Sequence, residues 1–175
     1  GMIWMITNGQ LLAYTTFGSQ FYDGFSLSPQ RSSLLTSMIM LVPIFITPII
    51  GIIIDKTGQK KRLLFLGLSI MTIAFFGIVT SWLPLTFWAI ALGGGFAFVP
   101  VVVFSLLPEL IKPEHTSFGL ALLTTSSNLG IAIGPMGFGS LLDATSGNFM
   151  VGFRVLSVFS IVSILAVSRI RKRHS

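Results

Sequence analysis

Six long apolar segments are the feature that most constrains what this chain can fold into. Each is about 20 residues long, which is the length that an α-helix needs to cross a bilayer. Helices satisfy their own backbone hydrogen bonds in lipid, and the runs lack the alternating pattern of a membrane barrel. The sequence therefore predicts an all-α membrane protein with six transmembrane helices, near residues 2–19, 33–54, 63–81, 84–107, 117–142 and 148–169.

Composition supports the membrane class and argues against a soluble domain. Of 175 residues, 53% are hydrophobic and only 9% are charged, whereas soluble domains carry about 25% charged residues. The net charge of +6 does not indicate nucleic-acid binding, because the basic residues lie at segment ends and form no basic–aromatic groove. We expect the lipid bilayer as a partner and no nucleic acid.

The basic residues also predict the orientation of the chain. Cytoplasmic loops of membrane proteins are enriched in lysine and arginine. If the loop after the second segment is cytoplasmic, only Arg31 and Arg154 fall on the opposite side. The other nine of the eleven basic residues are then cytoplasmic: Lys56, Lys60, Lys61, Arg62, Lys112, Arg169, Arg171, Lys172 and Arg173. This arrangement predicts a cytoplasmic C-terminus, with residues 170–175 as a basic tail.

The loop between the second and third segments combines one acid, a turn glycine and a basic cluster. Asp55 lies near the negative end of its own helix dipole, so it needs a basic group or another helix N-terminus as a partner. Gly58 can adopt the left-handed conformation that ends a helix. The simpler alternative is a generic cytoplasmic turn that contains an aspartate. The residues of interest in this candidate gating loop are Gly51, Asp55, Lys56, Gly58, Lys60 and Lys61.

The fifth segment contains five consecutive polar residues, 124–128, followed by a glycine–proline stretch. Polar residues inside a membrane meet either another helix or a water-filled cavity. We expect Asn128 to line a solute path, while its hydroxyl neighbours could equally bond to their own helix. Gly130 and Gly134 predict a close helix contact, and Pro135 predicts a kink.

Two further segments show related features. In the first, Thr7, Gln10 and Tyr14 fall near one helical face. That face is suited to line a hydrated cavity for a solute, or alternatively to form hydrogen bonds between helices. Pro100 predicts a bend in the fourth segment.

Enzymatic constellations are not visible in the sequence. The chain has no HExxH motif, no Walker loop and no pair of carboxylates within a segment. It has no cysteine, and its two histidines lie far apart, so a metal site is not expected. We therefore predict no catalytic residue, no metal and no cofactor.

The loop and the fifth segment together resemble a known family. Gly51-x-x-x-Asp55-Lys56-x-Gly58, followed by basic residues, resembles the signature loop of the major facilitator superfamily. The stretch Gly130-x-x-x-Gly134-Pro135 is similar to a glycine–proline helix of many members. The resemblance implies one six-helix half of a carrier that works by alternating access. It also implies that Asp55 contacts a helix of the opposite half, although Gln59 stands where many members have a basic residue.

Two details make the chain similar to the C-terminal half, so that an N-terminal six-helix half is the expected partner. No arginine occurs between Ser81 and Pro108, and a basic tail follows the sixth segment directly. Short stretches resemble a branch of lysosomal dipeptide uniporters, which implies a small-molecule solute and a lysosomal or vacuolar membrane. These stretches are 55–58, 113–115, 128–130 and 141–143. The alternative is a truncated, non-transporting membrane protein that binds a partner or forms a homodimer.

Overall fold

The computed structural model describes residues 1–169 and is helical throughout, with no strand in that range. This confirms the predicted all-α membrane class. The predicted tail at residues 170–175 lies outside the described residues. Six long helices and one short 3-10 helix follow in order: α1 Met2–Asp23, α2 Pro29–Thr57, α3 Lys60–Thr80, α4 Leu85–Leu110, η1 Pro113–His115, α5 Thr116–Ala144 and α6 Phe149–Ser168.

Five of the six long helices are long and apolar enough to span a membrane, and α1 is not among them. The polar side chains that the sequence places on α1, among them Thr7, Asn8 and Gln10, lower its hydropathy. These three residues are buried inside the bundle, so the polarity of α1 does not face lipid. With 22 residues, the helix is about 33 Å long and still matches the hydrocarbon thickness.

Several helices extend beyond the apolar runs that predict them. Helix α2 begins at Pro29 rather than near residue 33, because Ser28 caps it by accepting a hydrogen bond from the Arg31 amide at 3.4 Å. Serine at the cap and proline in the first turn both favour a helix start. At the far end, α2 continues to Thr57. Hydropathy marks only the lipid-facing part of a helix, whereas capping residues mark its ends.

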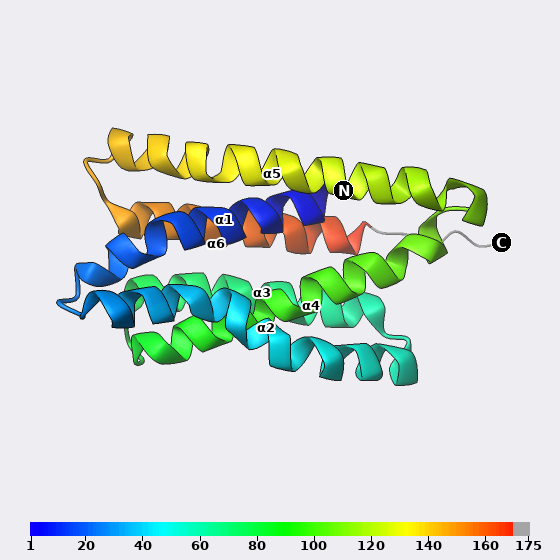
Figure 1. The fold of residues 1–175 in the computed structure, drawn as a ribbon, viewed down its shortest axis with the longest axis horizontal. Helices are drawn as coiled ribbons and strands as arrows, with labels where there is room; N and C mark the ends of the chain where they lie inside the picture. The colour runs from blue at the N-terminus through cyan, green and yellow to red at the C-terminus, as the bar shows by residue number, and fades with distance from the viewer. Residues whose placement is uncertain (170–175) are drawn as a thin grey trace.

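The helices form two groups that lie along a common long axis. Helices α1, α5 and α6 make one group, and α2, α3 and α4 make the other (Figure 1). Contacts of α3 with α6 and of α1 with α2 join the two groups. The α2–α3 and α4–α5 connections lie at one end of the bundle, and the other three connections lie at the opposite end (Figure 1).

The centre of the core is an aromatic cluster on helices α1, α3 and α6. Tyr14, Phe75 and Phe153 are fully buried, and their ring centroids lie 6.1–6.4 Å apart. Rings at this spacing attract one another in addition to burying apolar surface. The cluster therefore holds the two groups of helices together.

The outward faces of α2 and α5 are apolar and largely uncovered. Phe45 on α2 is 74% exposed, and Phe118 and Met136 on α5 are each 72% exposed. Exposed apolar surface of this extent requires lipid or another membrane helix. The chain is therefore a multi-pass integral membrane protein.

Candidate functional site

The candidate gating loop is a tight connection between α2 and α3. Helix α2 ends at Thr57, and the Gly58 amide donates to the Ile54 carbonyl at 2.8 Å. Gly58 has φ +63°, the left-handed conformation that the sequence predicts. Helix α3 begins two residues later at Lys60. This short reversal places the first basic side chain of α3 against the end of α4.

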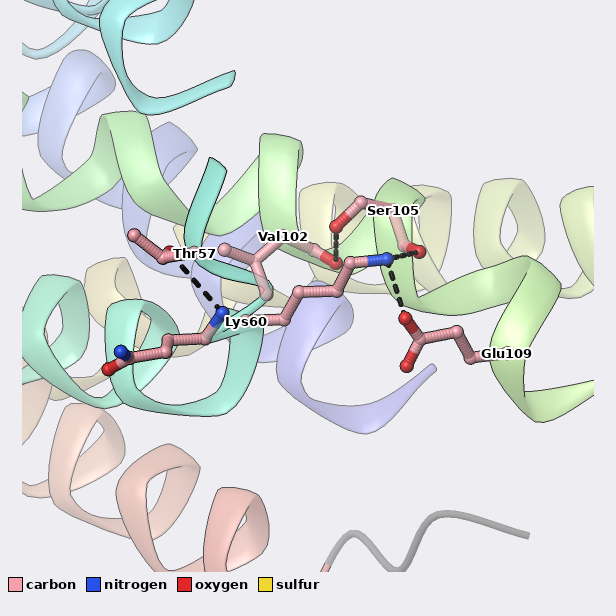
Figure 2. A network of polar contacts seen from close by, with 6 residues as sticks. Thr57, Lys60, Val102, Ser105 and Glu109 are labelled. Atoms are coloured by element: carbon pink, nitrogen blue, oxygen red, sulfur yellow. Dashed lines mark hydrogen bonds and ion pairs between the residues drawn. The ribbon is translucent and has the colours of Figure 1, made fainter. Parts of the chain in front are cut away.

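Lys60 is the centre of a polar network between α3 and α4 (Figure 2). Its ammonium donates to Glu109 Oε1 at 2.8 Å and to the Ser105 carbonyl at 2.7 Å. The Ser105 hydroxyl in turn donates to the Val102 carbonyl at 3.0 Å. The Lys60 side chain is only 17% exposed and that of Glu109 is 33% exposed, so water weakens this ion pair less than a surface pair. The network ties the loop to α4.

Glu109 is a residue that sequence reasoning missed. Its position at the end of the fourth apolar segment is visible in the sequence. Nothing in the sequence, however, gives the rotation of α4 against α3. That rotation decides which side chain meets Lys60.

Asp55 and Lys56 differ from Lys60 in that both are exposed at the end of α2. The Asp55 side chain makes no hydrogen bond or ion pair with any of residues 1–169. Lys61 is half-buried, and it lines a cavity of about 200 Å³ with Lys60, Glu109 and neighbouring residues. Gly51 lies within α2, one turn before Asp55.

The structure places the three predicted cavity residues of α1 inside the helical body. The Thr7 hydroxyl donates to the Ile3 carbonyl of its own helix at 2.8 Å. The Tyr14 hydroxyl lies 2.8 Å from that of Tyr22. Both of these bonds lie within α1. The Tyr14 hydroxyl also donates to the Leu35 carbonyl of α2 at 3.4 Å, which is a bond between helices. In this conformation Thr7 and Tyr14 have no exposed surface.

Gln10 connects α1 to α6. Its side-chain amide donates to the Leu156 carbonyl at 2.6 Å and to the Ser160 hydroxyl at 2.8 Å. Its side chain is also buried, with 2% of the residue exposed. This contact joins residues 146 and 150 positions apart in the chain, so no local pattern indicates it.

Asn128 lies apart from these buried residues, on an exposed part of α5. Its amide makes no side-chain hydrogen bond within the described chain. Two of its neighbours, Thr124 and Ser126, instead donate to the Leu120 and Leu122 carbonyls of their own helix. Asn128 is therefore an exposed polar side chain of this stretch that is available to a solute or to another helix.

The glycines of α5 make a close contact with α1. A Cβ on Gly134 would overlap backbone atoms of Gly9, and a Cβ on Gly130 would overlap the Met5 carbonyl oxygen. In return, a Cβ on Gly9 would lie 3.0 Å from the Gly130 carbonyl oxygen. Small residues let membrane helices approach this closely. Pro135 lies directly after this contact within α5, and Pro100 lies within α4.

Comparison with known proteins agrees with this architecture. Residues 2–175 match the Major Facilitator Superfamily. The chain is similar to the lysosomal dipeptide transporter MFSD1 of Danio rerio, with 26% identity over 82% of this chain and 30% of the relative. For the protein of the same name from Homo sapiens, identity is 24% over 85% of the chain and 33% of the relative. For that of Mus musculus, it is 27% over 84% and 31%.

The chain thus spans about a third of the length of the curated relatives that it matches. The match includes the helical reversal at Gly58 and the glycine contact of α5, the two features that carried the resemblance. A bundle of six long helices with these features, matched over nearly its whole length, belongs to the Major Facilitator Superfamily.

Proposed function

We propose that this chain is one six-helix half of a membrane carrier that moves a small solute by alternating access. The observation that supports it best is the family match over residues 2–175 in a chain that spans about a third of its relatives. The uncovered apolar faces of α2 and α5 are then surfaces for lipid and for the other half. We favour the C-terminal half, so the proposed partner is an N-terminal six-helix half.

The candidate gating loop supplies the second part of the proposal. Two rigid halves that rock against each other need contacts that form in one state and break in the other. Asp55 is exposed and has no side-chain partner among residues 1–169, so it is free to contact a helix of the other half. Lys60 is held by Glu109 and keeps the loop in place. We propose that the loop is the cytoplasmic gate.

For the solute we propose a dipeptide, and for the location a lysosomal or vacuolar membrane. Similar proteins are named lysosomal dipeptide transporters, which supports both proposals. A dipeptide carries amide and charged groups that need polar partners. The exposed amide of Asn128 can provide one of them. Thr7, Gln10 and Tyr14 could join the path only if α1 moves away from its present neighbours.

Replacing Asn128 by alanine is expected to reduce dipeptide uptake at least tenfold in proteoliposomes that contain both halves. The variant lacks the amide that would bond to the solute, and a hydrogen bond to a charged group contributes about 1.5–3 kcal/mol. Thr124→Ala is the matched control, one turn away on the same face, because its hydroxyl bonds to its own helix. Equal uptake by the two variants would show that Asn128 does not line the solute path. Uptake by the 175-residue chain alone would contradict the two-half proposal.

The proposed orientation can be tested with single cysteines, because the natural sequence contains none. Phe25→Cys lies in the α1–α2 connection and Lys112→Cys in the α4–α5 connection, at opposite ends of the bundle. If the basic end is cytoplasmic, a membrane-impermeant maleimide added to sealed lysosomes or vacuoles, whose outer face is cytoplasmic, should label position 112 and spare position 25. Permeabilising the membrane should make position 25 reactive as well. Labelling of position 25 but not of position 112 in the sealed organelles would show an inverted topology.

A further inference from the structure

The cavity of about 200 Å³ beside the candidate gating loop lies between the start of α3 and the end of α4. Sites that enclose a whole small molecule commonly measure about 300–1,000 Å³. This cavity is smaller, so it can hold one chemical group while the rest of a ligand lies outside. The end of the bundle that contains it is the basic one, where α2 and α3 are connected (Figure 1).

The charged residues around the cavity favour an anion. Three basic residues, Lys60, Lys61 and Arg62, and one acidic residue, Glu109, line it, which is an excess of two positive charges. Glu109 is paired with Lys60 at 2.8 Å, so its negative charge is compensated (Figure 2). Lys60 is also the first residue of α3, at the positive end of that helix dipole. A cation would therefore be repelled from the cavity, and an anion would be stabilised in it.

Arg62 adds hydrogen-bond donors to this charge. Its guanidinium group carries five N–H donors in one plane. One of its nitrogens, Nη1, donates to Gln59 Oε1 at 3.0 Å, and Gln59 also lines the cavity. The guanidinium therefore keeps further donors for a ligand. Arginine commonly binds a phosphate through two parallel hydrogen bonds, so a phosphate group matches this cavity in both charge and donors.

The face of α3 that carries Arg62 continues toward the middle of the membrane as an apolar stripe. Leu66, Ile73 and Phe76 follow Arg62 at spacings of four, seven and three residues, so they lie on the same helical face. They are 47%, 57% and 54% exposed. Exposed apolar surface on a membrane helix is suited to lipid hydrocarbon. A ligand with an anionic group in the cavity therefore finds apolar surface beside the rest of its length.

We propose that this cavity binds the phosphate of an anionic phospholipid, whose hydrocarbon lies along the stripe of Leu66, Ile73 and Phe76. Basic pockets between transmembrane helices commonly bind anionic lipid headgroups. Arg62 would donate to the phosphate, while Lys60 stays bonded to Glu109. The bound lipid would stabilise the start of α3 against the end of α4. The proposal requires that the chain lies in a bilayer, and it does not depend on the proposed transport function.

Photolabelling of the full chain in lipid nanodiscs tests the proposal with two matched probes. Both probes are phospholipids with the same acyl chains and a diazirine in one of them. One has the anionic phosphatidylglycerol headgroup, and the other has the zwitterionic phosphatidylcholine headgroup. At equal mole fraction, mass spectrometry should find about fivefold more phosphatidylglycerol than phosphatidylcholine adducts on the stripe of α3. Fivefold is the effect expected of one arginine near an anionic lipid.

Two variants separate the site from a general attraction of the basic end for anions. Arg62→Gln removes the charge and the planar donors, and it should bring phosphatidylglycerol labelling of the stripe close to the phosphatidylcholine level. Lys112→Gln is the matched control, because it removes one positive charge from the connection after α4. Lys112 does not line the cavity, and its side chain is 62% exposed. Its replacement should leave labelling of the stripe unchanged.

Four results would overturn the proposal. Equal labelling by the two headgroups in the unmodified chain would show that the cavity selects no anion, and this comparison needs no variant to fold. Equal losses in Arg62→Gln and Lys112→Gln would assign the preference to net charge. Suppression of the labelling by an excess of soluble glycerol phosphate would assign the cavity to a free phosphate compound. Loss of the labelling when the proposed other half is present would assign the cavity to a contact between halves.

Discussion

Replacing Gly134 by valine is expected to separate α5 from α1 and to destabilise the bundle severely. Even a single Cβ at this position would overlap backbone atoms of Gly9, which cannot move without shifting α1. Overpacking of a well-packed core costs about 1–3 kcal/mol. Because the obstacle here is backbone, we expect the top of that range or more. For a chain of this size, about 3 kcal/mol lowers the melting temperature by roughly 10 °C.

The measurement is thermal unfolding in detergent, combined with the yield of monodisperse protein on size-exclusion chromatography. Gly137→Val is the matched control on the same helix, because a Cβ at Gly137 meets no atom within 4 Å. It should melt within about 2 °C of the natural chain. If Gly134→Val and Gly137→Val had the same melting temperature, the close approach of α1 and α5 at Gly134 would be contradicted.

Reversing the charge of Glu109 is the second substitution that we expect to destabilise the bundle strongly. Glu109→Lys removes the ion pair with Lys60 and places a second ammonium group where the carboxylate now lies 2.8 Å from Lys60 Nζ. Hydrogen bonds to charged groups contribute about 1.5–3 kcal/mol, and partial exposure lowers this value. We expect a loss of about 2 kcal/mol, or roughly 5 °C in melting temperature.

The same variant should reduce transport in the two-half protein, because the candidate gating loop loses the ion pair that helps to attach it to α4. Swapping both charges, Lys60→Glu with Glu109→Lys, should restore part of the stability. It cannot restore all of it, since Lys60 also donates to the Ser105 carbonyl. A double variant as unstable as the single one would show that the ion pair contributes nothing.

Glu114→Lys is the control for net charge. It also changes an acid to a lysine near a lysine, but Glu114 lies 4.0 Å from Lys112 and its side chain is 69% exposed. Surface pairs of this kind contribute about 0–1 kcal/mol. Melting of Glu114→Lys should stay close to that of the natural chain. A loss equal to that of Glu109→Lys would assign the effect to overall charge rather than to the network.

The predicted features that the structure confirms are those that depend on local chemistry. Apolar runs of about 20 residues predict membrane helices because the bilayer sets that length. Gly58 has a left-handed conformation because the chain must reverse there, and glycine does so without a steric cost. The observed helix ends differ from the predicted ones by a few residues, as at Ser28, because capping rather than hydropathy decides where a helix begins.

The features that sequence reasoning left open or missed depend on contacts between distant segments. Thr7, Gln10 and Tyr14 share a helical face, but whether that face meets solute or protein depends on the packing of α1 among its neighbours. The partnership of Lys60 with Glu109 depends on the relative rotation of α3 and α4. A groove of about 370 Å³, lined by residues of α1, α5 and α6, exists because α5 approaches α1 closely while touching α6 little.

By itself, the sequence determined the class of this protein, its helices and its family. These follow from hydropathy, turn residues and short motifs, all of which act over a few residues. Only the tertiary structure decided which polar groups are buried, which remain available and where a cavity lies. The physical reason is that helices in a bilayer are already apolar on most sides, so hydropathy does not select their partners. Close packing at glycines such as Gly134, and polar pairs such as Lys60 with Glu109, select them instead.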